Sequence, residues 1–224
     1  MKRLSIIKYN KEIRLIKRAA LITKDIFETI SRDLKPGARE KDIAKKIEYI
    51  IKKKKLKRSF KTIVASGPNA AKPHAKLTNR IIRDNDIVVV DFGVVYKGYH
   101  SDLTRTFIIG RINRKLKKIY NVVKEAQIKA INKVKEGARI SDLVKSVHDY
   151  IRSKKLKRYI LHSLGHGVGL KIHEAPKLSE KNKKVLRSGM VCTIEPGLYI
   201  KGIGGVRIED MVLVKKQGCE VLTR

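Results

Sequence analysis

The stretch Asp86-Ile-Val-Val-Val-Asp91-Phe-Gly-Val-Val-Tyr-Lys97-Gly98-Tyr-His-Ser-Asp102-Leu-Thr-Arg-Thr106 predicts a β-hairpin. The β-branched run Ile87–Val90 is typical of a strand, and Lys97-Gly98 is typical of a tight turn. A second strand is predicted at Thr104–Ile109, where β-branched residues recur. We therefore expect two antiparallel strands, with an acidic residue at the end of the first and another at the start of the second.

The two acids of this hairpin are Asp91 and Asp102. A hairpin centred on the Lys97-Gly98 turn sets Asp91 opposite Thr104, and Asp102 becomes its diagonal neighbour at roughly 7–8 Å. Two carboxylates on one apolar face repel each other, so they require a cation or a shared proton. The alternative is that Asp91 ends its strand in a turn and Asp102 caps Thr104. On the hairpin alone, both interpretations stay open.

The sequence is internally repeated. Between residues 35 and 60, 12 of 26 positions are identical to the residue one hundred positions later. The repeat includes Lys54-Lys-Leu-Lys-Arg58, which recurs as Lys154-Lys-Leu-Lys-Arg158. Further along, Asp91 to Gly98 aligns with Glu195 to Gly202, with an acid, a Gly, a Lys and a Gly in register. The chain therefore consists of two related halves.

Each half is predicted to contain two helices followed by strands, which gives an α+β fold. We expect one domain over residues 1–224, with half-repeats at about 9–110 and 111–224. The second helix of each half is predicted at Asp42–Lys55 and Asp142–Lys155, from apolar residues at helical spacing. The remaining strands are predicted at Lys61–Ser66, His162–Leu164, Met190–Pro196 and Val206–Val214.

Two half-domains that each expose one face of a sheet bury those faces against each other. A second hairpin centred on Gly202 sets Glu195 opposite Glu209, so the inner surface would carry Asp91, Asp102, Glu195 and Glu209. The chain has only 21 acidic residues. Four of them on one inner surface indicate a site rather than a solvated face.

A histidine-rich stretch, His162-Ser-Leu-Gly-His166-Gly-Val-Gly-Leu-Lys-Ile-His173, lies between the two hairpins. Its glycines disfavour a helical pair of histidine ligands, and no strand-to-helix unit surrounds it as a phosphate loop requires. One histidine with four carboxylates suits two divalent ions that activate a water molecule. The alternative for any single histidine is packing in the core.

Composition limits the remaining function classes. Apolar residues make up 42% of the 224 residues, which indicates a globular protein, and no apolar run is long enough to span a membrane. The first ten residues lack the features of a signal peptide, and two isolated cysteines suit a reducing compartment, so we expect a cytoplasmic protein. The net charge of +33 permits contact with a ribosome or with nucleic acid. A solvated, lysine-rich surface is the favoured interpretation, because few aromatic residues interleave the basic ones.

The residues together resemble the pita-bread metallopeptidase superfamily, which includes methionine aminopeptidases, Xaa-Pro aminopeptidases and prolidases. The resemblance implies a curved, mainly antiparallel sheet with helices packed on it, and two divalent ions (Mn, Co, Fe or Zn). It covers the chain from about residue 9 onward and is carried by the segments Ser66-Gly-Pro-Asn-Ala-Ala-Lys-Pro-His74, Val90 to Phe107, His162 to Gly169, and Thr193 to Asp210.

The resemblance also implies a role for each matching residue. The implied metal ligands are Asp91, Asp102, His166, Glu195 and Glu209, with Asp102 and Glu209 bridging both ions. Glu195 would also shuttle the proton of the attacking water. The residues implied to contact substrate or orient its site are His74 and His173 at the scissile amide, His162 at the pocket for the residue after the cut, and Arg207 beside the carboxylates.

The forms Ser66-Gly-Pro-Asn and Gly205-Val-Arg-Ile-Glu-Asp210 resemble the Xaa-Pro branch, so we expect an aminopeptidase that cleaves before proline. Xaa-Pro enzymes usually carry a separate N-terminal domain, and we expect this chain to be the catalytic domain alone. Methionine removal from nascent chains is the first alternative, because the length is similar to that of a type I methionine aminopeptidase. A non-catalytic pita-bread module that binds protein or RNA is the second. The substrate is a peptide, and a homodimer is compatible with the family.

Overall fold

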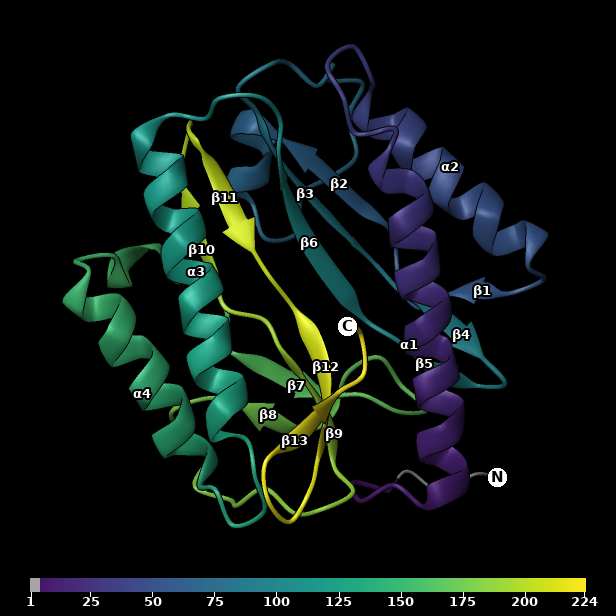
Figure 1. Ribbon diagram of the computed structural model, residues 1–224, viewed down its shortest axis with the longest axis vertical. Helices are drawn as coiled ribbons and strands as arrows, with labels where there is room; N and C mark the ends of the chain where they lie inside the picture. Colours follow the sequence, from purple (N-terminus) through teal and green to yellow (C-terminus); the bar gives the residue numbers. More distant parts are fainter. Residues whose placement is uncertain (1–4) are drawn as a thin grey trace.

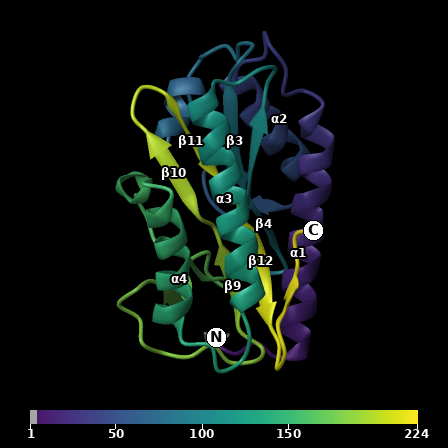
Figure 2. The ribbon, with the colours of Figure 1, turned by 60° about the vertical axis from the view of Figure 1, so that its left-hand side comes forward.

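The computed structural model describes residues 5–224. Residues 1–4, which belong to the basic N-terminal stretch discussed above, lie outside the described residues. Two pairs of helices flank the strands: Figure 1 shows α1 and α2 on one side, and α3 and α4 on the other. Helices α1 and α3 both run along the long axis of the molecule (Figure 2). The helices span Asn10–Ser31 (α1), Glu40–Lys53 (α2), Arg114–Lys133 (α3) and Ile140–Ser153 (α4).

The first half contains a three-stranded antiparallel sheet in the order β2-β3-β6. Its strands are Ile63–Ser66 (β2), Ile87–Phe92 (β3) and Leu103–Ile108 (β6). Asp91 pairs with Thr104, as predicted. The hairpin continues through Val94–Tyr96 (β4) and Tyr99–His100 (β5), and Lys57–Arg58 (β1) pairs with β4. The turn is at Lys97-Gly98, where both residues have positive φ angles of 49° and 89°.

The second half contains a five-stranded sheet in the order β13-β12-β9-β7-β8, together with the hairpin β10-β11. Ile194 pairs with Asp210, and Gly197 pairs with Arg207. This common register sets Glu195 across from Glu209, as predicted. The strands are Gly165–Gly167 (β7), Glu174–Leu178 (β8), Val191–Ile194 (β9), Gly197–Ile200 (β10), Gly204–Arg207 (β11), Asp210–Val214 (β12) and Cys219–Val221 (β13).

Several predicted strand boundaries are wrong. The strand expected at His162–Leu164 begins only at Gly165, after a short 3₁₀ turn at Lys157–Tyr159. The strand expected at Val206–Val214 is two strands, because the backbone N–H of Glu209 donates to the carbonyl of Thr104 in the other half. The strand expected at Met190–Pro196 likewise ends at Ile194, before the acid. In both strands the break lies at a predicted metal ligand.

The repeat is visible in the backbone. Helices α2 and α4 begin and end one hundred residues apart, and each is followed by a lysine with a positive φ, Lys55 at 56° and Lys155 at 61°. An isolated bridge joins Arg39 to Ile81 in the first half, and its counterpart joins Arg139 to Val185 in the second. The two halves therefore follow the same path over these segments.

The largest group of buried apolar side chains crosses the boundary between the halves. It joins Ala65, Ala70, Ile87 and Val89 of the first half to the residues of α3, α4 and the second sheet. Because neither half can bury these faces alone, we propose that the half-repeats 9–110 and 111–224 form one domain.

One domain with a shared core predicts one cooperative unfolding transition. In differential scanning calorimetry of the full chain, we expect a single endotherm, with a ratio of calorimetric to van't Hoff enthalpy of about one. Two resolved endotherms would contradict the proposal, because they would mean that each half has a core of its own.

Candidate metal centre and active site

A cavity of about 790 Å³ opens between the two halves, lined by residues that come from both. All nine residues predicted for the site line this one cavity: His74, Asp91, Asp102, His162, His166, His173, Glu195, Arg207 and Glu209. Asp91, His166 and Arg207 lie in β3, β7 and β11, and the other six lie in segments between named elements. The pairing of the two inner faces therefore brings together side chains that are more than one hundred residues apart.

The ligand atoms of Asp102, His166 and Glu209 all lie within 4.8 Å of one another. His166 Nε2 is 3.5 Å from Asp102 Oδ2 and 3.4 Å from Glu195 Oε1. Asp91 lies near the end of β3, and Asp102 directly precedes β6, the strand that pairs with β3. Glu209 lies between β11 and β12 of the second half. The arrangement brings one imidazole close to carboxylates from both halves.

Burial and mutual repulsion disfavour the charged forms of these acids. Burial raises the pKa of Asp102 well above its ordinary value, and the carboxylates of Asp91 and Glu195 raise it further. The pKa of Glu209 is raised well above its ordinary value by burial and then by Asp102. Burial also raises the pKa of Asp91, although the guanidinium of Arg207 acts in the opposite direction. The protein alone therefore does not balance the charge of this cluster.

Arg207 is the one cationic side chain buried among the described residues that line the cavity, with an exposed fraction of 3%. Its Nη2 donates to Asp91 Oδ2 at 2.6 Å, and its Nε donates to Thr104 Oγ1 at 3.1 Å. Thr104 Oγ1 in turn donates to Glu209 Oε2 at 2.7 Å. Arg207 and Thr104 therefore orient one carboxylate from each half, and they leave the remaining negative charge uncompensated.

The residues present fit divalent metal ions. Asp91 Oδ1 is buried and has no hydrogen-bond partner, although a buried carboxylate oxygen is normally satisfied. Carboxylate oxygens with a single imidazole form the hard donor set that suits divalent ions. Cations held there would satisfy the unpaired oxygen and balance the acids that Arg207 does not.

His162 lines the cavity, and Tyr199 contacts His162 from behind. Tyr199 OH lies 2.8 Å from His162 Nε2 and accepts a hydrogen bond from Arg207 Nη1 at 2.8 Å. Burial lowers the pKa of His162, so its ring is neutral near pH 7. A neutral ring donates from Nδ1 to the carbonyl of Ser163 and accepts from the Tyr199 hydroxyl at Nε2.

His74 and His173 lie at the exposed side of the cavity. The ring of His173 packs edge-on against that of His166, with 4.3 Å between centroids, and burial lowers its pKa. His74 is exposed, and its segment is fixed by Arg207 Nη1, which donates to the carbonyl of the preceding Pro73 at 3.1 Å. Both imidazoles face the open space beside the carboxylates.

Sequence reasoning missed the network that holds the segment of His74. Glu40, at the start of α2, is fully buried and accepts from Ser66 N at 2.7 Å and Ser66 Oγ at 2.8 Å. It also accepts from Asn69 Nδ2 and Thr78 Oγ1. The one available signal was the repeat, because the counterpart of Glu40 is the apolar Ile140. An acid at this position is therefore not required to form the helix. It accepts hydrogen bonds from the residues on either side of His74.

Comparison with known proteins identifies the class. Residues 14–216 match the family described as metallopeptidase family M24. The chain belongs to this family, so the resemblance inferred from its motifs is confirmed. The predicted α+β fold is confirmed as the pita-bread fold that this superfamily shares.

Individual relatives carry Xaa-Pro names. The Xaa-Pro dipeptidase of Pyrococcus horikoshii is 43% identical over 220 residues, covering 98% of this chain and 63% of that protein. A putative Xaa-Pro aminopeptidase of Mycoplasma genitalium is 42% identical over 94% of this chain and 60% of its own length. The solved structure of an Xaa-Pro dipeptidase from Bacillus anthracis superposes with a TM-score of 0.95 at 44% identity, covering 98% of this chain and 62% of that one. The chain thus spans less than two thirds of each of these relatives.

The Glu40 network predicts a measurable loss of stability. In Glu40→Gln, an amide N–H₂ replaces one acceptor oxygen and faces donors. We expect the free energy of unfolding to fall by about 1.5–3 kcal/mol, the range for a buried hydrogen bond to a charged group. Amide hydrogen exchange should rise over residues 66–78. The measurements are urea denaturation and exchange mass spectrometry.

Glu48→Gln is the matched control on the same helix, because Glu48 pairs with Arg58 at an exposed position. We expect its free energy of unfolding to change by less than about 0.5 kcal/mol. Equal effects of the two substitutions would contradict the role given to Glu40.

Proposed function

We propose that this chain is the catalytic domain of a metal-dependent aminopeptidase that hydrolyses the N-terminal peptide bond of peptides with proline in second position. The observation that supports the proposal best is the convergence of four carboxylates and His166 in one cavity with a single buried arginine. The motifs belong to the metallopeptidase family, and the relatives reported above are named for Xaa-Pro substrates. Those names favour the Xaa-Pro proposal over methionine removal.

The metal ligands in this proposal divide into three groups. Asp91 would hold one ion, Asp102 and Glu209 would contact both, and His166 and Glu195 would complete the second. Two divalent ions bound there would polarise the scissile carbonyl and lower the pKa of a water molecule. Arg207 would keep Asp91 oriented through the 2.6 Å contact described above.

The side chains around the ligands supply the remaining chemistry. Thr193 Oγ1 donates to Glu195 Oε1 at 3.2 Å and so orients this carboxylate, which we propose as the acceptor and donor of the transferred proton. His74 and His173 would donate to the oxygen on which negative charge develops. His162, held by Tyr199, would line the pocket for the prolyl ring.

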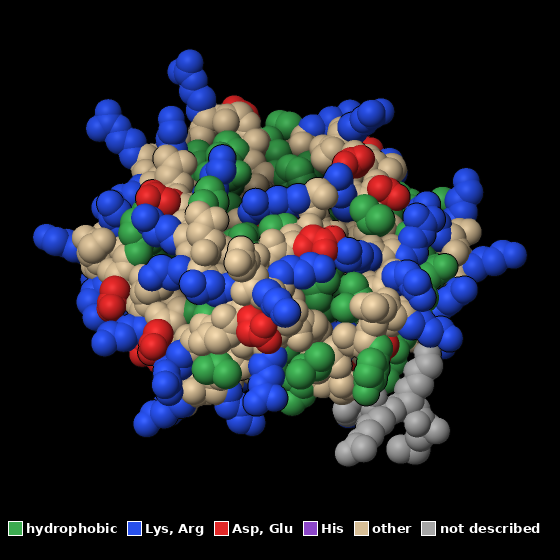
Figure 3. Space-filling view, turned by 60° about the horizontal axis from the view of Figure 1, so that its bottom comes forward, with side chains coloured by type: hydrophobic (Ala, Val, Ile, Leu, Met, Phe, Trp, Pro, Cys, Tyr) green, Lys and Arg blue, Asp and Glu red, His purple; other side chains and the backbone are tan. Residues whose placement is uncertain are grey.

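The second alternative, a non-catalytic binding module, has less support, because each of the five predicted ligand positions holds a metal-binding side chain. Nucleic acid or ribosome contact rests on the net charge of +33 alone. Lysine and arginine side chains spread over the whole face seen in Figure 3 rather than gathering in one place. Across residues 5–224, no helix is both long enough and apolar enough to traverse a membrane.

Specificity can be tested directly with two peptides. We expect the purified protein, loaded in turn with Mn, Co, Fe and Zn, to cleave Ala-Pro-Ala with a kcat/KM at least about tenfold higher than Met-Ala-Ser. Tenfold corresponds to about 1.4 kcal/mol of transition-state binding. The physical reason is the preformed pocket beside His162. A tenfold preference for Met-Ala-Ser would instead support methionine removal.

Two variants control this experiment. Glu209→Ala should lose both activities and reduce bound metal, because this acid is proposed to contact both ions. Glu28→Ala removes an exposed acid from α1 and should change neither. A fully active Glu209→Ala enzyme would overturn the two-metal proposal.

A further inference from the structure

The central cavity has charges of opposite sign at its floor and its rim. The acids of the metal cluster form the floor, and the remaining acid, Glu174, is paired with Lys8 at 2.6 Å. Three exposed lysines line the same cavity, and no ion pair or hydrogen bond of their ammonium groups occurs among the described residues: Lys61, Lys76 and Lys177. A peptide with a free carboxylate is therefore favoured with that carboxylate toward the exposed lysines.

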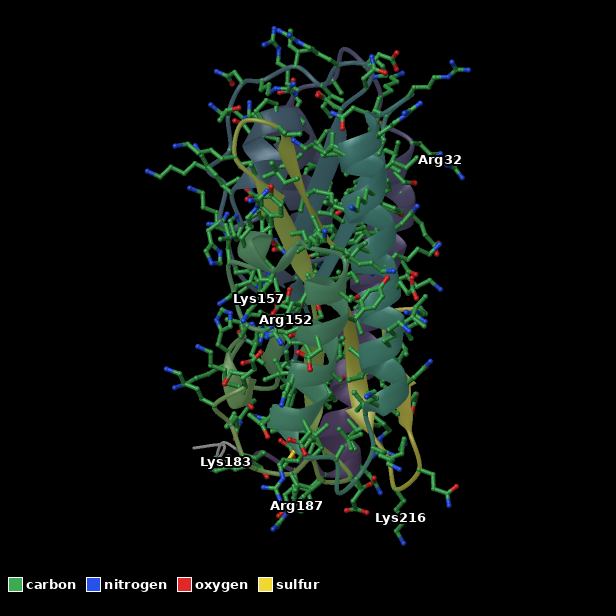
Figure 4. The ribbon with its side chains drawn as sticks, turned by 90° about the vertical axis from the view of Figure 1, so that its left-hand side faces the viewer. Arg32, Arg152, Lys157, Lys183, Arg187 and Lys216 are labelled. Carbon is green, nitrogen blue, oxygen red and sulfur yellow. The ribbon has the colours of Figure 1, made fainter. Side chains whose placement is uncertain are left out.

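A second cavity, of about 480 Å³, adjoins the first and shares Ser163 and Lys177 with it. Its apolar lining comes from Val144 of α4 and from Ile160. Three lysines line it as well: Lys157, Lys177 and Lys181. Figure 4 shows Lys157 just beyond the end of α4, in the same part of the view as Arg152. Because they share Ser163 and Lys177, the two cavities are neighbours at the segment that follows His162.

The second cavity has one acid against three lysines. Glu180 lines this cavity; its Oε1 is 2.6 Å from His148 Nδ1, and its carboxylate also interacts electrostatically with Lys157. Lys157 and Lys181 have no acidic partner within ion-pair distance among the described residues. The cavity thus combines an apolar surface with a net positive charge.

The other half of the repeat supplies a natural comparison. A cavity of about 400 Å³ beside α2 is lined by Lys45, Lys52 and Arg58, but Arg58 is paired there with Glu48 at 2.6 Å. It shares no lining residue with the central cavity. Of these two basic cavities, only the one in the second half shares lining residues with the central cavity.

We propose that the cavity lined by Lys157, Lys177 and Lys181 binds the C-terminal part of peptide substrates and prefers a carboxylate there. This proposal rests on the proposed function, because the N-terminal amine must lie at the metal cluster. The two cavities share Ser163 and Lys177, so a peptide that extends past these residues would reach the second cavity. The carboxylate has two sources, the C-terminus of a short peptide and an acidic side chain of a longer one. The substrates indicated are peptides longer than two residues with negative charge after the proline.

The test uses pairs of peptides that differ only in charge. Ala-Pro-Ala-Ala with a free C-terminus is compared with its C-terminal amide, and Ala-Pro-Ala-Glu-amide is compared with Ala-Pro-Ala-Gln-amide. The first pair reports the C-terminal carboxylate and the second reports the side chain. For the native chain, we expect the charged member of at least one pair to have a kcat/KM about fivefold higher, since each exposed ion pair contributes modestly. This preference should decrease at high salt.

Matched double variants locate the effect. Lys157→Glu with Lys181→Glu should abolish or reverse the preference, and should leave the kcat/KM of the neutral Ala-Pro-Ala-Ala amide within about twofold. Lys45→Glu with Lys52→Glu changes the net charge by the same amount in the first-half cavity and should keep the preference. Both pairs of residues lie outside the proposed catalytic machinery.

The outcomes separate this inference from the proposed function. Cleavage of the peptides with no charge preference in the native chain, or an equal loss of preference in both double variants, would overturn the carboxylate subsite and leave the aminopeptidase proposal intact. If no Xaa-Pro peptide is cleaved, the proposed function fails. Fluorescence anisotropy of a labelled Ala-Pro-Ala-Glu-amide peptide then tests the subsite by binding alone. Equal binding by the native chain and the Lys157→Glu, Lys181→Glu variant would overturn it.

Discussion

The structure depends on the burial of several carboxylates against one arginine. An ion removed from water loses several kcal/mol of hydration, and this loss is recovered only through well-placed partners. Arg207 donates a hydrogen bond to Asp91, and Thr104 donates one to Glu209, but Asp91 Oδ1 still has no hydrogen-bond partner. Divalent cations would supply the missing compensation. Metal binding would therefore help to hold the two inner faces together, as well as supply the chemistry.

The sheets are interrupted where the acids are needed. Ideal strands through Glu195 and Glu209 would use their backbone groups for pairing within the second half. Glu195 N does bond within the second half, to the carbonyl of Leu164, but Glu209 N donates to the carbonyl of Thr104. This second bond ties the second half to the first hairpin. The breaks between β9 and β10 and between β11 and β12 thus place two carboxylates in the cavity, and the residue at the second break also joins the halves.

The register of both hairpins could be predicted from sequence, because side chains alternate with a period of two and each turn is marked by glycine. Asp91 opposite Thr104 and Glu195 opposite Glu209 follow from that alone. The strand ends could not be predicted, since they depend on hydrogen bonds from the other half, such as that of Glu209. The role of Glu40 could not be predicted either, because an acidic residue in the first turn of a helix is common and does not indicate burial. Its burial depends on a segment that is folded over it from some thirty residues away.

We propose that this cavity holds two divalent ions between the halves. Anomalous diffraction from crystals of the manganese-loaded protein, measured at the manganese edge, tests this proposal most directly. We expect two peaks in the cavity, one beside Asp91 and one beside His166 and Glu195, with Asp102 and Glu209 in contact with both. No peak in the cavity, or a single peak that leaves Asp91 uncoordinated, would contradict it.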